Sequence, residues 1–330
     1  MPQPSYAIIA VTLKCNARCI MCDIWKRESG REVEPAFYQR LPSSLREVNV
    51  TGGEPFLRED LPRIIEVIHN RCDSPRIVIS SNGLLPKRIE DSMERIVKVD
   101  PKIAVRISID AVGKKHDELR GISGAFRKAM ESLNILKQDG IRDLGIALTL
   151  MDSNVSEVNR VYDLAGEMGV EFSLSVVTSS PLYFGKKGSL RPVDNGALRD
   201  RFNYLVRSEL RHWSLRRFAR AYFDHTLWEY LRTQRRPLRC DAGKEFFYLD
   251  PEDNLYGCDV LDFPLGNLRD HAFKELWFSE RTEKFRGRAN ECHKCWMICT
   301  AKTAMRRSLH KPFFWLVKNK VRAHLRTQIL

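Results

Sequence analysis

The sequence predicts an α/β fold, an open, TIM-like partial (β/α)6 barrel followed by a small C-terminal domain. Short β-branched runs recur over the first 180 residues, and a longer stretch with helical periodicity follows most of them. Strand–helix units in a row imply a parallel sheet with right-handed crossovers. Six units are too few to close an eight-stranded barrel, so an open partial barrel fits better.

Each element follows from its local pattern. The expected strands are Tyr6–Leu13, Glu47–Thr51, Arg76–Ser80, Ile103–Ser108, Gly145–Leu150 and Glu171–Val176. The expected helices are the amphipathic stretches Leu61–Asn70, Ile89–Val97, Ala125–Asp139 and Val155–Met168. We expect Asn154 or Ser153 to cap the last of these helices. Chemistry in such sheets sits at the carboxyl ends of the strands, so the motifs found there are the site candidates.

Length and composition limit the class of protein. A chain of 330 residues fits one or two domains. With 29% charged residues it is not a membrane-embedded bundle. Its apolar runs fall far short of the ~20 residues that a spanning helix needs, and no signal segment opens the chain. We therefore expect a cytoplasmic protein.

Eight of the nine cysteines fall into two groups. The first group is Cys15, Cys19 and Cys22, and the second is Cys240, Cys258, Cys292, Cys295 and Cys299. Grouped thiols in a cytosolic chain favour metal binding over disulfides. The ninth, Cys72, is expected to be an ordinary half-buried thiol.

The first group has the spacing C-x3-C-x2-C. Iron–sulfur cubanes are normally held by four thiolates, so three would leave one iron open for a small ligand. Zinc is the alternative, but a closed structural zinc site needs four ligands, and neither a His nor a fourth Cys is close in sequence. The spacing therefore favours an iron–sulfur cluster.

This loop, with the strand before it, resembles the cluster loop of the radical S-adenosylmethionine (SAM) superfamily. The resemblance implies that SAM chelates the open iron of a [4Fe–4S] cluster. It also implies that reductive cleavage of SAM gives a 5′-deoxyadenosyl radical, which abstracts a substrate hydrogen. The family usually has an aromatic residue before the third cysteine, where this chain has Met21.

The motif after the second strand extends the resemblance. Gly52, Gly53 and Glu54 match the family's GGE motif. The resemblance implies that the glycines let the backbone approach SAM and that the Glu54 carboxylate accepts from the SAM ammonium group. A plain glycine turn is the alternative.

Further SAM contacts are implied at the next two strand ends. Ser80 and Asn82 resemble the third-strand segment near the ligand, and Ser108 and Asp110 resemble the fourth-strand ribose contacts. Arg120 is a candidate for contact with the SAM carboxylate or the substrate. Each has a structural alternative, a turn for the strand ends and an exposed side chain for Arg120. No catalytic acid or base is identified.

The second cysteine group resembles the auxiliary-cluster extensions called SPASM and, in shortened form, Twitch. A complete SPASM domain carries seven cysteines and two clusters, so five imply one auxiliary [4Fe–4S] cluster. Cys240, Cys258, Cys292 and Cys295 are the expected ligands, with Cys299 as a spare or alternative. A structural zinc ribbon is the competing interpretation.

We expect four parts in the chain. These are a radical SAM core over 1–215, a basic helical linker over 216–239, a SPASM/Twitch-like domain over 240–305 and a basic amphipathic tail over 306–330. The tail holds seven Lys or Arg and no acid. This excess favours an anionic partner: a phosphorylated substrate, an acidic membrane surface or, least favoured, nucleic acid.

The tail could form an amphipathic helix with Phe314, Val317, Val321 and Leu325 on one side. Two interpretations stay open. The helix docks on the barrel with its charges in solvent, or it makes peripheral contact with an acidic membrane.

These observations predict a radical SAM enzyme supplied with electrons by a flavodoxin- or ferredoxin-type reductant. Its substrate is a small molecule, a lipid- or sugar-linked molecule or a peptide, and its reaction an oxidation, bond formation or rearrangement. Only fourteen residues precede Cys15, which tilts the expectation away from a peptide. The competing hypothesis is a zinc-stabilised, non-enzymatic protein that binds a membrane or nucleic acid.

Overall fold

The computed structural model describes residues 3–28, 30, 32–182, 184–185, 187–193, 196–325 and 328–330. Its strands are β1 (Tyr6–Ala10), β2 (Glu47–Thr51), β3 (Arg76–Ser81), β4 (Ala104–Ser108), β5 (Asp143–Leu150), β6 (Glu171–Val176), β7 (Phe246–Leu249), β8 (Asn254–Tyr256) and β9 (Pro264–Asn267). Its α-helices are α1 (Leu61–Arg71), α2 (Pro86–Val99), α3 (Lys114–Arg120), α4 (Ala125–Gln138), α5 (Val158–Glu167), α6 (Gly196–Leu210), α7 (Leu215–Thr233), α8 (Phe273–Trp277), α9 (Glu280–Asn290), α10 (Ile298–Arg307) and α11 (His310–His324).

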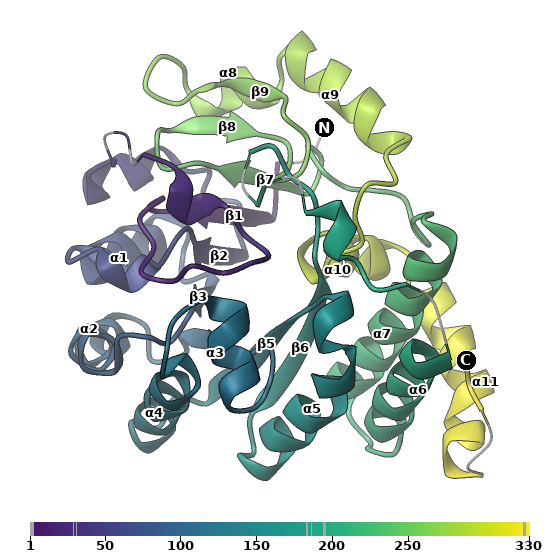
Figure 1. Cartoon of the computed structure of the whole chain (residues 1–330). Helices are drawn as coiled ribbons and strands as arrows, with labels where there is room; N and C mark the ends of the chain where they lie inside the picture. The colour runs from purple at the N-terminus through teal and green to yellow at the C-terminus, as the bar shows by residue number, and fades with distance from the viewer. Residues whose placement is uncertain are drawn as a thin grey trace.

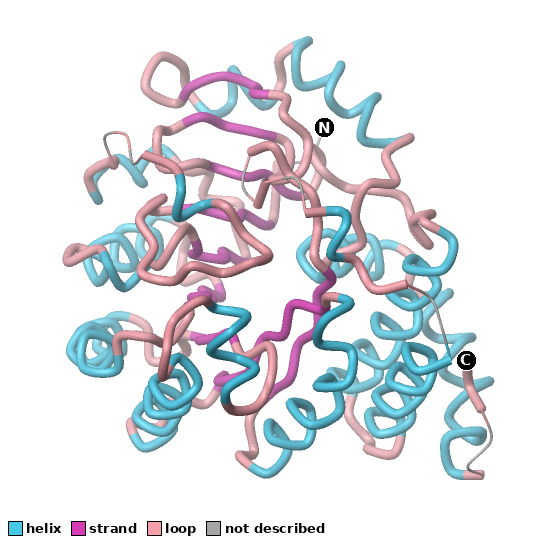
Figure 2. Tube along the Cα trace, in the orientation of Figure 1, coloured by secondary structure: helices cyan, strands magenta, loops and turns pink. Residues whose placement is uncertain are grey.

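The first six strands form the predicted partial barrel. Strands β1 to β6 pair in sequence order, and every pairing is parallel. Helices α1, α2, α4 and α5 lie outside the curved sheet (Figure 1). The strand tube in Figure 2 follows the same curve around the centre of the molecule. The expected α/β class and partial barrel are confirmed.

One local expectation is wrong. Helix α5 begins at Val158, after a 3-10 segment over Asp152–Glu157, so no helix starts at Val155. The Asn154 side chain accepts from the backbone N–H of Met151 at 2.7 Å and donates to the carbonyl of Asp110 at 3.0 Å. It therefore ties the end of β5 to the end of β4 instead of capping α5.

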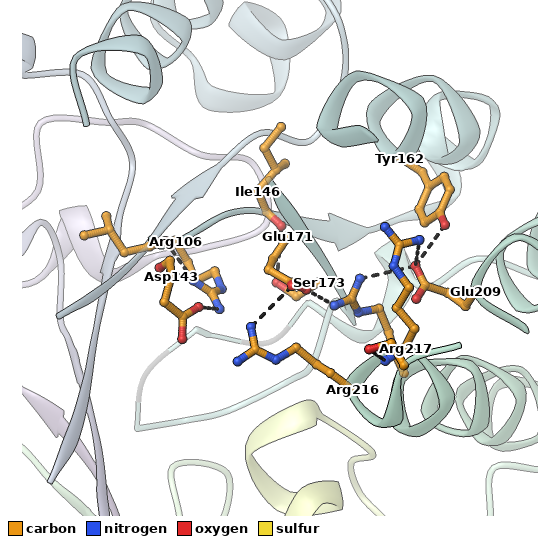
Figure 3. Close-up of polar contacts among 12 residues, drawn as sticks. Arg106, Asp143, Ile146, Tyr162, Glu171, Ser173, Glu209, Arg216 and Arg217 are labelled. Carbon is orange, nitrogen blue, oxygen red and sulfur yellow. Dashed lines mark hydrogen bonds and ion pairs between the residues drawn. The ribbon is translucent and has the colours of Figure 1, made fainter. Parts of the chain in front are cut away.

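The amino-terminal ends of the barrel strands carry charged side chains. Arg106 of β4 donates to the Asp143 carbonyl at 2.8 Å and pairs with its carboxylate at 2.5 Å (Figure 3). Two-residue alternation places Arg106 on the same face of β4 as Ser108, which lines the cavity described below. These charged side chains therefore close the amino-terminal end of the barrel, which we call the barrel floor.

Helices α6 and α7 complete this floor. Glu171 of β6 pairs with Arg216 at 3.3 Å and also with Arg220, both from α7. The buried Glu209 carboxylate of α6 pairs with Arg220 at 3.2 Å and accepts from the Tyr162 hydroxyl at 2.8 Å (Figure 3). Ion pairs thus occupy one end of the barrel and leave the carboxyl ends of the strands for a binding site.

The C-terminal strands continue the barrel sheet. β7 pairs with β1 in parallel, with Tyr6 opposite Phe246, and β8 and β9 follow in antiparallel order. From α10, Lys302 pairs with Glu47 of β2, and its ammonium lies 3.5 Å from the Tyr6 ring centroid. The described strands therefore form one nine-stranded sheet, ordered β6-β5-β4-β3-β2-β1-β7-β8-β9.

Within the described ranges, none of the helices has the length and apolar character needed to cross a membrane.

Candidate active site

A cavity lies at the carboxyl ends of the barrel strands. Five strands in a row contribute hydroxyl side chains to its wall: Thr51, Ser80 with Ser81, Ser108, Thr149 and Ser175. The residues expected from the sequence that line it are Cys15, Cys19, Cys22, Gly52, Gly53, Ser80, Asn82, Ser108 and Arg120. Residues separated by up to 105 positions in the chain therefore meet here, as the strand-end argument predicts.

The three N-terminal thiols face a common space in this cavity. Burial, with smaller contributions from Glu54 and the neighbouring Cys19 and Cys22 thiols, raises the pKa of Cys15 to about 12. Burial likewise raises the pKa of Cys22 to about 11, with a contribution from Cys19. Bound metal would hold such thiols as thiolates, so this donor set fits a metal centre.

A cubane and a single metal ion differ in how far apart their protein ligands stand. In the part of the chain that the structure describes, no three His, Cys, Asp or Glu side chains gather closely enough to hold one metal ion. Each cysteine of a cubane binds its own iron, so cluster ligands stand further apart than the ligands of one zinc ion.

Helix α3 holds the cysteine loop in place. The N–H groups of Arg18 and Ile20 donate to the last carbonyls of α3, those of Arg120 and Leu119, at 2.9 and 3.0 Å. Gly121 ends this helix with a φ of +65°, and a Cβ there would lie 2.6 Å from the Arg18 carbonyl oxygen. The close approach and the left-handed backbone both require glycine.

Two side chains donate towards cysteine sulfurs. Arg120 reaches the Cys19 sulfur at 3.7 Å, while its other terminal nitrogen pairs with Asp110 at 2.6 Å. Asn82 reaches the Cys15 sulfur at 3.8 Å. Arg120 is buried, so the alternative interpretation of Arg120 as an exposed side chain is wrong. Asp110 is fully buried behind the cavity wall and orients Arg120.

The two glycines of the GGE motif pack against the chain that leads into the cysteine loop. A Cβ on Gly52 would lie 2.4 Å from the Thr12 carbonyl oxygen, and one on Gly53 would lie 2.0 Å from that of Lys14. The N–H of Gly53 donates to Thr12 at 2.7 Å. These glycines are therefore required by a backbone approach within the protein.

Glu54 lies behind the cavity wall. Its carboxylate accepts from the N–H groups of Phe56 and Asn82 at 3.1 and 2.7 Å and from the Ser81 hydroxyl at 2.9 Å. Burial raises the pKa of Glu54 to about 7, although these three hydrogen bonds oppose the shift. In this structure the carboxylate ties the end of β2 to the end of β3.

The second cysteine group is also gathered. Burial raises the pKa of Cys295 to about 12; Arg236 opposes the shift, and Cys240 and Cys292 add to it. Burial raises the pKa values of Cys258 and Cys299 too, and the negative charge of the nearby Cys295 thiolate adds to both shifts. All five thiols therefore belong to one group, in which Cys292 and Cys299 are half-buried and the other three are buried, and this donor set fits an auxiliary cluster.

Arg236, from the expected basic linker, reaches into this group. Its guanidinium donates to the Cys295 carbonyl at 2.7 Å and to the Cys295 sulfur at 3.5 Å. It also lies 5.0 Å from the centroid of the Trp296 ring. From composition alone, Arg236 is only one of the eleven arginines between Arg199 and Arg239.

Several cavity residues were not predicted. Thr149 and Ser175 lie at strand ends, so the rule that identified Ser80 and Ser108 could have found them. Phe184 and Met297 carry no local signal, because they reach the cavity from loops outside the six strands. Met297 lies between Cys295 and Cys299, so it places the second cysteine group beside the cavity.

Comparison with known protein families gives two matches. Residues 9–165 match the radical SAM superfamily, and residues 240–296 match the SPASM iron–sulfur cluster-binding domain. The chain is 32% identical over 164 residues to the Fe-coproporphyrin III synthase of Methanosarcina barkeri, covering 48% of this chain and 40% of that protein. It is 24% identical over 307 residues to the sporulation killing factor maturation protein SkfB of Bacillus subtilis, covering 88% and 70%.

Solved structures show the same fold. The enzyme anSMEcpe with bound AdoMet and the Cp18Cys peptide superposes with a TM-score of 0.65 at 20% identity, covering 86% of this chain and 82% of that one. SuiB of Streptococcus suis, bound to the precursor peptide SuiA, gives 0.65 at 14% identity, covering 90% and 70%. By its two family matches, the chain has a radical SAM domain followed by a C-terminal SPASM-type domain: it is a radical SAM enzyme whose cofactors are SAM, a [4Fe–4S] cluster and auxiliary iron–sulfur.

Proposed function

We propose that Cys15, Cys19 and Cys22 hold the cluster that binds SAM. The observation that carries this proposal is the shared cavity, in which the buried Cys19 thiol and the half-buried Cys15 and Cys22 thiols face the hydroxyl-lined ends of five strands. Hydrogen bonds to the sulfurs of a cluster change its reduction potential, and Asn82 and Arg120 are placed to donate such bonds.

The SAM contacts implied by the resemblance belong to the same proposal. Ser80 and Ser108 supply hydroxyls at the cavity wall, and Gly52 and Gly53 supply backbone there. Glu54 and Asp110 act from behind the wall, where Glu54 holds two strand ends and Asp110 positions Arg120. When bound, the cluster and SAM supply a 5′-deoxyadenosyl radical for hydrogen abstraction.

We assign the auxiliary cluster to Cys240, Cys258, Cys292 and Cys295, with Cys299 as the alternative ligand. The gathering of all five thiols supports a single cluster here. Met297 forms part of the cavity wall, so this domain would shape the substrate site. The four-part division of the chain at 215, 239 and 305 is part of the same proposal.

We propose that the substrate is a peptide segment. This proposal replaces the small, lipid-linked or sugar-linked molecule that the short segment before Cys15 favoured. SkfB, a sporulation killing factor maturation protein by name, matches 88% of this chain, and the matched SuiB structure holds a precursor peptide. The residues lining the cavity include one side chain with a full charge, Arg120, and it is already paired with Asp110. A polyanionic small molecule would need several free cations in the cavity, so a neutral peptide segment fits better.

The ligand assignment is tested by replacing Cys15, Cys19 and Cys22 with Ala. We expect reductive SAM cleavage to be lost while the C-terminal cluster still loads, so iron should fall from about eight to about four per chain. The matched control is Cys72→Ala, outside both groups, which should keep the full iron content and the activity. SAM cleavage by the triple variant would refute the assignment of the active cluster.

The substrate class is tested with reduced, oxygen-protected enzyme and deuterium-labelled candidates. Peptides encoded next to the gene should transfer label into 5′-deoxyadenosine, whereas labelled porphyrins and nucleotides should not. Transfer from a porphyrin or a nucleotide instead would refute the peptide proposal and leave the cluster assignment intact.

A further inference from the structure

Helix α11 docks on the barrel through one face and exposes an apolar face to solvent. Asn319 and Ala323 are buried, and the Trp315 ring packs against Tyr222 of α7 at 5.5 Å between centroids. Docking of the tail is therefore confirmed. The apolar residues expected to share one side of the helix do so, but that side points away from the barrel.

This outer face is large. Its exposed apolar side chains, each at least 60% accessible, are Phe313, Phe314, Val317, Val321 and Leu325. Helical spacing puts them on one stripe, because they recur at intervals of one, three and four residues. A continuous exposed apolar stripe marks an interaction site more often than scattered single residues do.

The turn between α6 and α7 extends the stripe. Trp213 and Leu215 are 84% and 86% exposed. The Lys320 ammonium of α11 lies 4.4 Å from the Trp213 ring centroid and donates to the His212 carbonyl at 3.0 Å. The turn and α11 are therefore neighbours, as Figure 1 also shows for α6, α7 and α11. We call the five residues of the stripe, with Trp213 and Leu215, the tail face.

Positive charge borders the tail face on both sides. Lys311, Lys318 and Arg322 follow one edge of the helical stripe, and Lys320 follows the other. The sequence from Arg306 to Leu330 contains no Asp or Glu to offset them. The apolar stripe and its cations are the two components of an interfacial helix, which buries its apolar side and keeps its cations at the lipid headgroups.

We propose that the tail face binds the surface of an acidic membrane. A second copy of the chain is a poorer occupant, because a two-fold contact would oppose like charges along both edges of the stripe. A lipid surface accepts all of the side chains at once, with the aromatic residues at the acyl boundary and the cations on the phosphates. The enzyme would then work at the membrane without a spanning helix.

The test is cosedimentation of the full, cluster-loaded chain with vesicles. One set contains phosphatidylcholine alone and the other contains phosphatidylglycerol as well. We expect binding to the acidic vesicles only, weakened by salt. Phe314→Ser should weaken it about tenfold or more, and Lys318→Ser about fivefold. Both side chains are exposed, so the fold should survive.

Matched controls are Phe278→Ser and Lys102→Ser, which alter exposed residues elsewhere on the molecule and should leave vesicle binding unchanged. Three results would overturn the proposal: absence of binding to acidic vesicles, binding that Phe314→Ser does not weaken, or a wild-type dimer that Phe314→Ser dissociates. None of these measurements depends on turnover, so they are independent of the proposed substrate and ligands.

Discussion

At the scale of single residues, the cysteine spacing and the glycine pair were visible in the sequence because each is dictated by a local requirement. The three N-terminal thiols lie in one short loop, and a close backbone contact excludes a Cβ. The physical role of the glycines was not visible. Gly53 meets Lys14, 39 residues earlier in the chain, and that contact exists only once β1 and β2 are paired.

Substitution of Gly53 should therefore damage the N-terminal cluster site. In Gly53→Ala, a Cβ placed 2.0 Å from the Lys14 carbonyl oxygen must push away the segment that enters Cys15. We expect a loss of about 1–3 kcal/mol in the free energy of unfolding and the selective loss of the N-terminal cluster. Denaturant unfolding and iron analysis measure the two effects.

The matched control is Gly166→Ala in α5, where a Cβ meets nothing within 4 Å. This variant should keep both clusters and gain up to about 1 kcal/mol from helix propensity. Equal iron content in the two variants would contradict the packing role of Gly53.

At the scale of elements, β-branched runs located all six barrel strands to within three residues at either end. Strand β1 is apolar throughout, whereas β2 to β6 alternate because their outer face packs under helices and their inner face carries hydroxyls and charges. The start of α5 was predicted wrongly because the Asn154 side chain makes its hydrogen bonds to the ends of β4 and β5. These tertiary contacts compete with local capping of the helix. Likewise, the sequence did not reveal that Arg216 and Arg220, within the expected basic linker, complete the barrel floor.

One carboxyl beside this floor should give the protein a distinctive pH dependence. Asp224 of α7 is buried, and neither of its oxygens has a hydrogen-bond partner among the described residues. Burial, and then the Glu209 carboxylate, raises the pKa of Asp224 well above its usual value. The folded chain thus holds this proton more tightly than the unfolded chain, so stability is lost as pH rises above about 4.

Asp224→Asn removes this titration. We expect the variant to gain about 1 kcal/mol or more in unfolding free energy at pH 7, with the gain shrinking towards pH 4. Thermal unfolding at several pH values provides the measurement. Asp200→Asn, on the exposed surface of α6, is the control and should change little at any pH. A gain that does not depend on pH would contradict a charge-based origin.

At the scale of the whole molecule, the sequence indicated two cysteine groups and two domains but did not reveal how the domains join. The β1–β7 pairing connects residues about 240 positions apart, and no local pattern encodes such a partner. A large separation along the chain likewise explains why Met297 and Phe184 were not predicted to line the cavity. Contacts made between remote loops depend on the completed fold.

The shared sheet should make the two domains unfold together. We expect backbone amides of β1 and β7 to exchange hydrogen with the same, high free energy of opening, close to that of global unfolding. Amides of α11, which packs against the outer surface of α6 and α7, should open at lower energy. Hydrogen exchange followed by mass spectrometry makes this comparison. A lower opening energy for β7 than for β1 would show that the C-terminal domain unfolds by itself.

The pairing of β1 with β7 also sets a problem for synthesis on the ribosome. Strand β1 acquires its second neighbour only when residues near 246 have been made, about 240 residues after β1 itself. Until then, one side of a wholly apolar strand has unpaired backbone groups and is open to improper association. The nascent chain is therefore expected to need chaperone protection, and slow synthesis would lengthen the period of risk.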